Sequence, residues 1–209
     1  MAHTIRPRTK EKSPSRRERK KQEMREAIYN AAIGLFIQRG FDNVTIEDIT
    51  EKVDIAKGTF FNYFSSKDSI LPFFIARHLD EVRKRLTRET KRDKTAREKL
   101  QRLFSLLGKL VIENEPLIKW VLMESFRLKV YQKEKEEVFS NILHIMVDIL
   151  KEGQEKGEFN KDMDPDKVAE ILESIFFSSS MRWLAFEKYA PLTDDLFNKV
   201  NYFLDGIMA

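Results

Sequence analysis

The chain has 209 residues, of which 42% are hydrophobic and 34% charged, and it contains 7 Gly, 6 Pro and no Cys. The lack of cysteine excludes disulfide scaffolds, thiolate zinc sites and cysteine nucleophiles, and this length can bury a core without such crosslinks. Few turn residues and many charges favour long helices over a many-stranded β fold. The net charge of +4 is unevenly placed, because residues 1–25 carry +7 and the remainder carries −3.

The N-terminal segment is basic and is interrupted by Ser13, Pro14 and Ser15, which predicts a flexible basic arm over residues 1–16. A solvated tail and an electrostatic arm for nucleic acid both account for its charge. A membrane surface is disfavoured, because the arm lacks large apolar residues that would insert. No apolar run approaches the roughly 18 residues of a membrane span, and no apolar segment follows the basic one as in a secretory signal. We therefore expect a cytoplasmic protein.

Residues 17–68 have the pattern of a three-helix, helix-turn-helix domain. The first helix has apolar residues at helical spacing and ends near Gly40. Thr45 and Asp48 form a capping box that opens a short second helix. Asp54 then occupies the turn, since Asp tolerates left-handed backbone, and a third helix is expected over about 56–63. The inward residues of the first helix are Ile28, Ala31, Ala32, Leu35 and Phe36.

The remainder, residues 69–209, is predicted to be helical throughout. Capping signals mark several helix starts: Ser69 with Pro72, Thr95 with Glu98, and Asp164 with Pro165. The expected helices cover about 69–92, 95–114, 116–128, 132–156, 164–189 and 191 onward. The fold class is thus all-α, with about nine helices: an N-terminal helix-turn-helix domain and a C-terminal helical domain.

Residues 25–71 resemble the TetR family of transcriptional regulators, whose pattern they match densely and with the right spacing. The sequence departs from that pattern at Thr50, Asp54, Ala56 and Phe61, where the family usually has Ala, Gly, Ser and Tyr. The matching residues are Arg25, Ile28, Ala31, Ala32, Phe36, Gly40, Phe41, Thr45, Ile49, Ile55, Lys57, Gly58, Thr59, Phe61, Tyr63, Phe64, Lys67 and Leu71.

The resemblance implies that the third helix and its surroundings bind double-stranded DNA. Lys57, Gly58 and Asn62 are then nearest the base edges, because Lys can donate to guanine and Asn can bond adenine. Phosphate contacts are implied for Thr45, Thr59, Tyr63 and Lys67, and Phe61 lies in the same interface without the phenolic hydroxyl that the family's Tyr offers there. Independently of any resemblance, Phe60 and Phe64 can share a buried face, and Gly58 suggests close approach of another molecule.

The family's C-terminal domain binds a small-molecule effector, and this region is rich in Phe, Met and Trp, which suit an adaptable apolar pocket. Ordinary core packing accounts for most of the same residues. Glu124 and Arg127 are candidate polar anchors, although a solvated helix face explains them equally well. The candidate lining is His78, Phe104, Trp120, Met123, Phe139, Leu143 and Met146.

Two C-terminal helices carry wide apolar stripes that suit a four-helix interface in a homodimer. These residues are Val168, Ile171, Leu172, Ile175, Phe176, Ser179, Phe197, Val200, Phe203 and Leu204.

No catalytic motif is present, the three histidines lie far apart, and we expect no enzyme activity, metal or other cofactor. The sequence thus predicts a sequence-specific regulator, a repressor released from a palindromic operator by a small hydrophobic or amphipathic effector. The alternative is a helical DNA-binding protein without sequence specificity or an effector.

Overall fold

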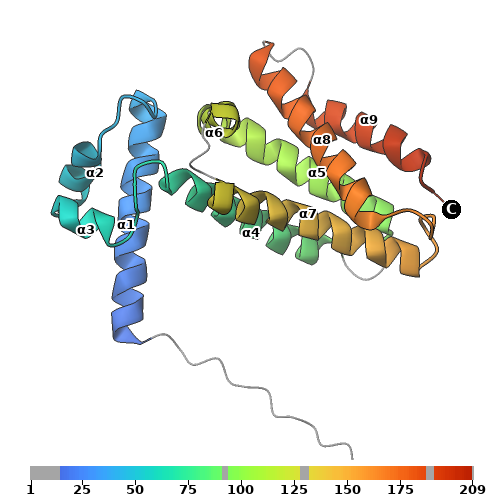
Figure 1. The fold of residues 1–209 in the computed structure, drawn as a ribbon, viewed down its shortest axis with the longest axis horizontal. Coiled ribbons are helices and arrows are strands. Elements are labelled where there is room, and N and C mark those ends of the chain that lie inside the picture. Colours follow the sequence, from blue (N-terminus) through green and yellow to red (C-terminus); the bar gives the residue numbers. More distant parts are fainter. Residues whose placement is uncertain (1–14, 91–93, 128–131, 187–190, 209) are drawn as a thin grey trace, which may run out of the picture. The chain divides into compact units, whose positions relative to one another are not determined.

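The computed structural model describes residues 15–90, 94–127, 132–186 and 191–208, with the backbone alone for 123–127 and 132–140. Nine helices lie in this part of the chain, as the periodicity and the caps predicted (Figure 1). They fall into two compact units, residues 1–67 and 68–209. No helix in the described ranges is long and apolar enough to cross a bilayer.

The first unit consists of α1 (Arg16–Arg39), α2 (Ile46–Val53) and α3 (Lys57–Phe61). Its helix ends follow the expected capping chemistry: Thr45 and Asp48 form the capping box of α2, and Gly40 ends α1 with a φ of 79°. The five inward residues predicted for α1 are all buried. Together with Ile49, Phe60 and Phe64 they form the core on which α2 and α3 rest.

The second unit contains six helices. Two of the three predicted caps form, since Thr95 and Glu98 make a capping box and Asp164 accepts hydrogen bonds from the first turn of the next helix. Ser69 precedes α4 as predicted, but its side chain makes no capping hydrogen bond, because its own backbone is already helical. The eighth helix is shorter than the expected 164–189. The helices are α4 (Ile70–Glu89), α5 (Ala96–Glu113), α6 (Glu115–Arg127), α7 (Gln132–Glu155), α8 (Pro165–Ala185) and α9 (Leu192–Asp205).

The helices α4, α5 and α7 pack pairwise against one another, while α8 packs against α7 and α9, and α9 returns to α5. Fully buried apolar side chains from this arrangement include Leu100, Leu103, Phe104 and Met146. At the far end of α7 the chain turns at Gly157 with a φ of 73°, and Phe159 pairs with Met208 in an isolated antiparallel bridge.

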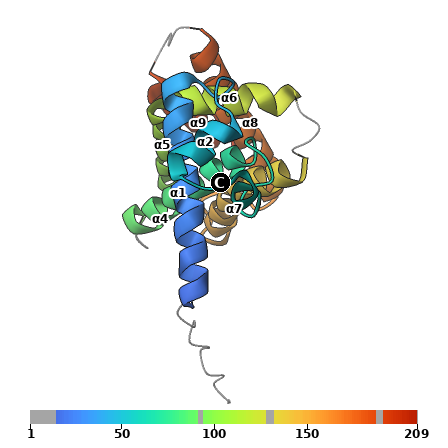
Figure 2. The same ribbon diagram turned by 90° about the vertical axis from the view of Figure 1, so that its left-hand side faces the viewer.

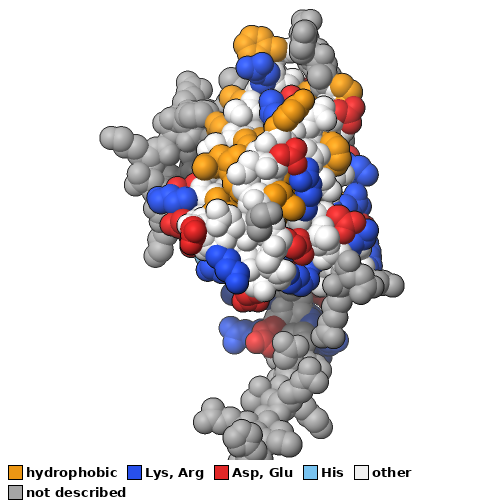
Figure 3. Space-filling model, turned by 90° about the vertical axis from the view of Figure 1, so that its right-hand side faces the viewer, with side chains coloured by type: hydrophobic (Ala, Val, Ile, Leu, Met, Phe, Trp, Pro, Cys, Tyr) orange, Lys and Arg blue, Asp and Glu red, His pale blue; other side chains and the backbone are white. Residues whose placement is uncertain are grey.

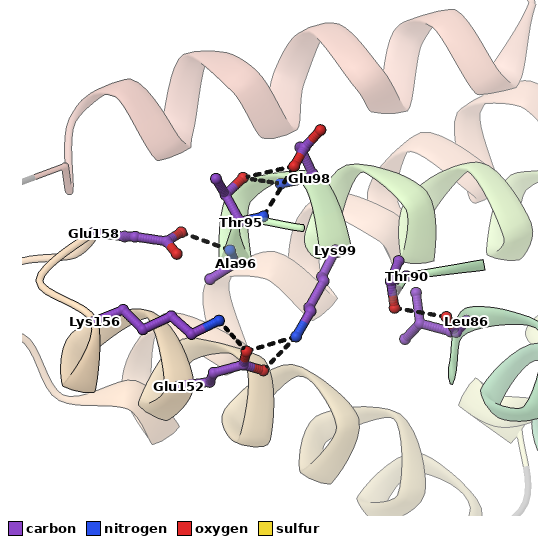
Figure 4. A network of polar contacts seen from close by, with 9 residues as sticks. All are labelled: Leu86, Thr90, Thr95, Ala96, Glu98, Lys99, Glu152, Lys156 and Glu158. Carbon is purple, nitrogen blue, oxygen red and sulfur yellow. Dashed lines mark hydrogen bonds and ion pairs between the residues drawn. The ribbon is translucent and has the colours of Figure 1, made fainter. Parts of the chain in front are cut away.

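Charged groups fasten the start of α5 to the end of α7 (Figure 4). Lys99 donates hydrogen bonds of 2.6 Å to both carboxylate oxygens of Glu152, which also accepts one of 2.7 Å from Lys156. Lys156 and then Lys99 hold the pKa of Glu152 below its usual value. The carboxylate of Glu158 accepts the backbone N–H of Ala96 at 2.6 Å, where a negative charge also complements the dipole of α5.

Gly153 allows α7 to approach α5 closely at this junction. A Cβ built on Gly153 would lie 2.8 Å from Cβ of Ala96 and closer still to the ring of Phe159, which is fully buried. None of these atoms is the free end of a flexible side chain. A side chain at position 153 must therefore displace the packed core.

We expect Gly153→Ala to lower the free energy of unfolding by about 1–3 kcal/mol, because it overpacks a dense interior. Gly34→Ala is the matched control, since Gly34 lies within α1 and a Cβ there meets nothing within 4 Å. That substitution should leave stability unchanged or raise it by up to about 1 kcal/mol. Chemical unfolding followed by circular dichroism measures both, and equal stability of the two variants would contradict the assigned role of Gly153.

Candidate nucleic-acid interface

A left-handed residue fixes the turn between α2 and α3. Asp54 has φ 58° and ψ 54°, its N–H donates to the carbonyl of Glu51 at 3.2 Å, and the N–H of Ile55 donates to that of Thr50 at 3.0 Å. This pair of bonds is the Schellman motif, which ends a helix and sends the chain off at a defined angle. The turn expected from Asp54 is thereby confirmed, although glycine is the usual residue there.

The third helix presents a polar edge outward and two phenylalanines inward. Phe60 and Phe64 are buried with ring centroids 6.0 Å apart, whereas Phe61 is 48% exposed and meets Phe60 edge to face at 5.6 Å. The helix is shorter than the predicted 56–63, because after Phe61 the N–H of Asn62 and that of Tyr63 bond to carbonyls three residues back. Lys57, Gly58 and Asn62 are exposed, and Thr59 and Tyr63 are half-buried.

Several proposed DNA contacts already have partners within the protein. Lys57 forms an ion pair with Glu47 in the first turn of α2, and this hydrogen bond holds the pKa of Glu47 below its usual value. The hydroxyl of Thr45 accepts the N–H of Asp48 at 3.1 Å and donates to its carboxylate at 2.6 Å. The pairing of Lys57 with Glu47 could not be read from the sequence, because it depends on the angle between two helices.

Lys67 has a structural role that the sequence did not reveal. Its ammonium donates to the carbonyls of Phe41 and Val44 at 2.8 Å each and lies 4.3 Å from the centroid of the Phe41 ring. Two of its three N–H groups therefore hold the loop between α1 and α2. A hydrogen bond from Lys67 to a DNA phosphate would therefore use the third N–H.

The proposed effector residues that the structure describes lie on mutually packed helices of the second unit. Phe104 of α5 and Met146 of α7 are fully buried, and His78 of α4, Trp120 of α6 and Leu143 of α7 are half-buried. His78 also hydrogen-bonds through Nδ1 with the carbonyl of Phe74, at 2.9 Å. The side chains of Met123, Glu124, Arg127 and Phe139 lie outside the described residues.

The apolar stripes of α8 and α9 divide between the interior and the surface. Five residues proposed for the dimer interface are buried within the chain itself, and one of them, Ser179, accepts a hydrogen bond of 2.8 Å from Lys199 of α9. Ile171 and Phe197 are each 47% exposed, and Ile175, Phe176 and Phe203 are half-buried. Figure 3 shows hydrophobic side chains gathered on this face. The five buried residues are Val168, Leu172, Ser179, Val200 and Leu204.

Comparison with known proteins agrees with this geometry. Residues 28–72 match the model of the bacterial regulatory proteins of the tetR family. The fatty acid metabolism regulator protein of Bacillus subtilis is 25% identical over 159 residues, which are 75% of this chain and 81% of that protein. The crystal structure of Thermus thermophilus FadR, a TetR-family repressor in complex with lauroyl-CoA, has a TM-score of 0.75 and 26% identity, covering 86% of this chain and 92% of that one.

A second relative, the transcriptional repressor DhaR of a Mycobacterium species, is 22% identical over 84% of this chain and 97% of its own length. The helix-turn-helix geometry and these matches define the chain as a DNA-binding transcriptional regulator. Within that class, residues 28–72 carry the helix-turn-helix of the TetR family, and the chain as a whole is similar to TetR-family repressors.

Packing among the described residues gives no reason for glycine at position 58, since a Cβ there meets nothing within 4 Å. We expect Gly58→Ala to leave the free energy of unfolding unchanged or raise it by up to about 1 kcal/mol, because alanine favours helix. DNA affinity should nevertheless fall, because the added methyl group separates α3 from the groove. Anisotropy titration with labelled DNA and thermal unfolding of the same preparation test this pair of effects, and unchanged DNA affinity would contradict close approach at Gly58.

Proposed function

We propose that the protein is a homodimeric repressor that binds a palindromic operator and is released from it by a fatty acyl thioester of coenzyme A. The observation that carries the DNA-binding part is the Schellman turn at Asp54, which joins α2 to α3 inside the segment matching the family model. Phosphate contacts by Thr59, Tyr63 and Lys67 and base contacts by Lys57 and Asn62 remain our proposal. The protein acts by binding and not by catalysis, and it works where the chromosome lies, in the cytoplasm.

The effector class is supported by the likeness to Thermus thermophilus FadR, whose structure contains lauroyl-CoA. An acyl chain needs an apolar interior, and Phe104 and Met146 supply fully buried apolar groups on two helices that pack together. The ligand domain connects directly to the DNA-binding unit, since α4 begins at Ile70 soon after Lys67. Release requires that the ligand bind preferentially to a state with low DNA affinity.

Selection of genomic DNA fragments by the purified protein should enrich one inverted repeat. A two-fold dimer places its recognition helices in successive major grooves, with half-sites about 34–36 Å apart or a multiple of that distance. Lauroyl-CoA should then weaken operator binding by roughly 5- to 150-fold, the usual range of coupling between two sites. Free coenzyme A and lauric acid are the controls, and Trp120 and Trp183 provide a fluorescence signal for ligand binding.

The two parts of the proposal fail separately. Enrichment of no sequence over random DNA would support the alternative, a DNA-binding protein without specificity. If an operator is enriched but acyl thioesters of every chain length leave the protein's affinity for it unchanged, only the proposed effector class is wrong. Because coupling is reciprocal, operator DNA must also weaken lauroyl-CoA binding by the same factor.

The exposed part of the α8 and α9 stripes supports the dimer. Ile171 and Phe197 are exposed beside residues already packed, so Ile171→Glu and Phe197→Glu should leave the fold intact while placing carboxylates in an apolar interface. We expect the double variant to sediment as a monomer at micromolar concentration and to lose operator binding. Ile112→Glu on α5, where the side chain is 41% exposed, is the control. A double variant that remains dimeric would place the interface elsewhere.

A further inference from the structure

The first turns of α1 extend beyond the core of the DNA-binding unit. No residue from Arg16 to Ala27 is buried, and the first buried residue of the helix is Ile28. We call Arg16–Ala27 the α1 overhang; at about 1.5 Å per residue it is roughly 18 Å long. In Figures 1 and 2 it continues as a helix past α2, and in Figure 1 past α3 as well.

The overhang is anchored at both ends. At its start the hydroxyl of Ser15 accepts the N–H of Glu18 at 3.2 Å, and the carboxylate of Glu18 accepts the N–H of Ser15 at 2.6 Å. At its base the guanidinium of Arg25 lies 5.5 Å from the ring centroid of Phe64, which packs against Phe60 of α3. The capping box stabilises the helix, and the cation–π contact ties it to the helix-turn-helix core.

Charges on the overhang are sorted by side. Successive residues are turned by about 100° in an α-helix, so positions three and four apart share a side. The buried residues of α1 form a stripe that packs toward α2. When this stripe is continued backward from Ile28 in steps of three and four residues, it includes Arg17, Lys20 and Lys21. The other side carries Glu23 and Glu26 together with Arg16 and Arg19, while Glu18 is committed to the capping box.

This sorting of charge distinguishes the overhang from a solvated helix. A helix that only needs water tends to intersperse both signs around its surface. Here three cations line the side of α1 on which α2 lies, whereas on the other side Glu23 and Glu26 balance the charges of Arg16 and Arg19. A duplex that receives α3 in its major groove, about 12 Å wide, has a phosphate backbone at each edge of that groove.

We propose that the basic side of the α1 overhang binds the DNA phosphate backbone that flanks the groove entered by α3, through Arg17, Lys20 and Lys21. This inference rests on the proposed DNA-binding function and extends it to a preformed helical contact. Its contacts are to phosphates, so they strengthen binding to every sequence and leave the preference among sequences to α3.

Two single substitutions separate this proposal from a general effect of net charge. Arg17→Gln and Arg19→Gln each remove one positive charge from the same helix, two residues apart but on opposite sides, and Gln keeps a high helix propensity. Binding of the full-length chain to a labelled mixed-sequence duplex is measured by anisotropy between 50 and 200 mM salt. The triple variant Arg17→Gln, Lys20→Gln, Lys21→Gln enlarges the effect.

We expect Arg17→Gln to weaken binding and to reduce the steepness of its salt dependence by about 0.9 for each phosphate that the protein no longer neutralises, whereas Arg19→Gln changes the steepness little. The triple variant should lose roughly tenfold or more in affinity while selecting the same genomic site as the unmodified protein. Equal effects of Arg17→Gln and Arg19→Gln, or no effect of the triple variant, would overturn the proposal. Failure of the unmodified protein to select any site would instead defeat the proposed operator recognition, and the mixed-sequence comparison would still decide the role of the overhang.

Discussion

The left-handed backbone of Asp54 is the constraint on which the DNA-binding unit depends. An L-residue other than glycine rarely adopts this conformation, and Asp is among the few that tolerate it. The Schellman bonds that accompany it end α2 and set the direction in which the chain enters α3. Only from this angle can Phe60 and Phe64 be buried while Lys57, Gly58 and Asn62 stay exposed. The chemistry of α3 is therefore set by a turn that contacts no ligand itself.

Local rules make most of the fold predictable from the sequence. The capping pairs Thr45–Asp48 and Thr95–Glu98 and the start at Asp164 depend on residues within one turn of each other, so their spacing is sufficient evidence. The predicted end of α3 is wrong because its last bonds tighten to the three-residue spacing, which helical periodicity does not distinguish.

Contacts between helices are beyond the reach of the sequence. Apolar periodicity identifies a stripe on a helix but not the surface that covers it. It therefore groups Leu172 with Ile171, although Leu172 is buried and Ile171 is 47% exposed. In the same way, nothing local distinguishes Gly153, which contacts Ala96 and Phe159, from Gly34, which has open space. The bonds of Lys67 to the carbonyls of Phe41 and Val44 span more than twenty residues and depend on the completed fold.

The distribution of cations in the first unit suggests two kinds of DNA contact. Lys57 next to Gly58 is already paired with Glu47, so the proposed base contact requires it to exchange that carboxylate for a base edge. An exposed pair of this kind contributes little to stability, so a correct base can displace it. With a wrong base, Lys57 keeps its internal partner and the contact adds nothing, so the pair sharpens discrimination.

On the overhang, Glu23 and Glu26 lie on the side away from Arg17, Lys20 and Lys21, whose charges can meet any phosphate. The proposed contacts thus place base selection on α3 and a purely electrostatic contact on α1, so substitutions on α1 should change general affinity without changing base selection.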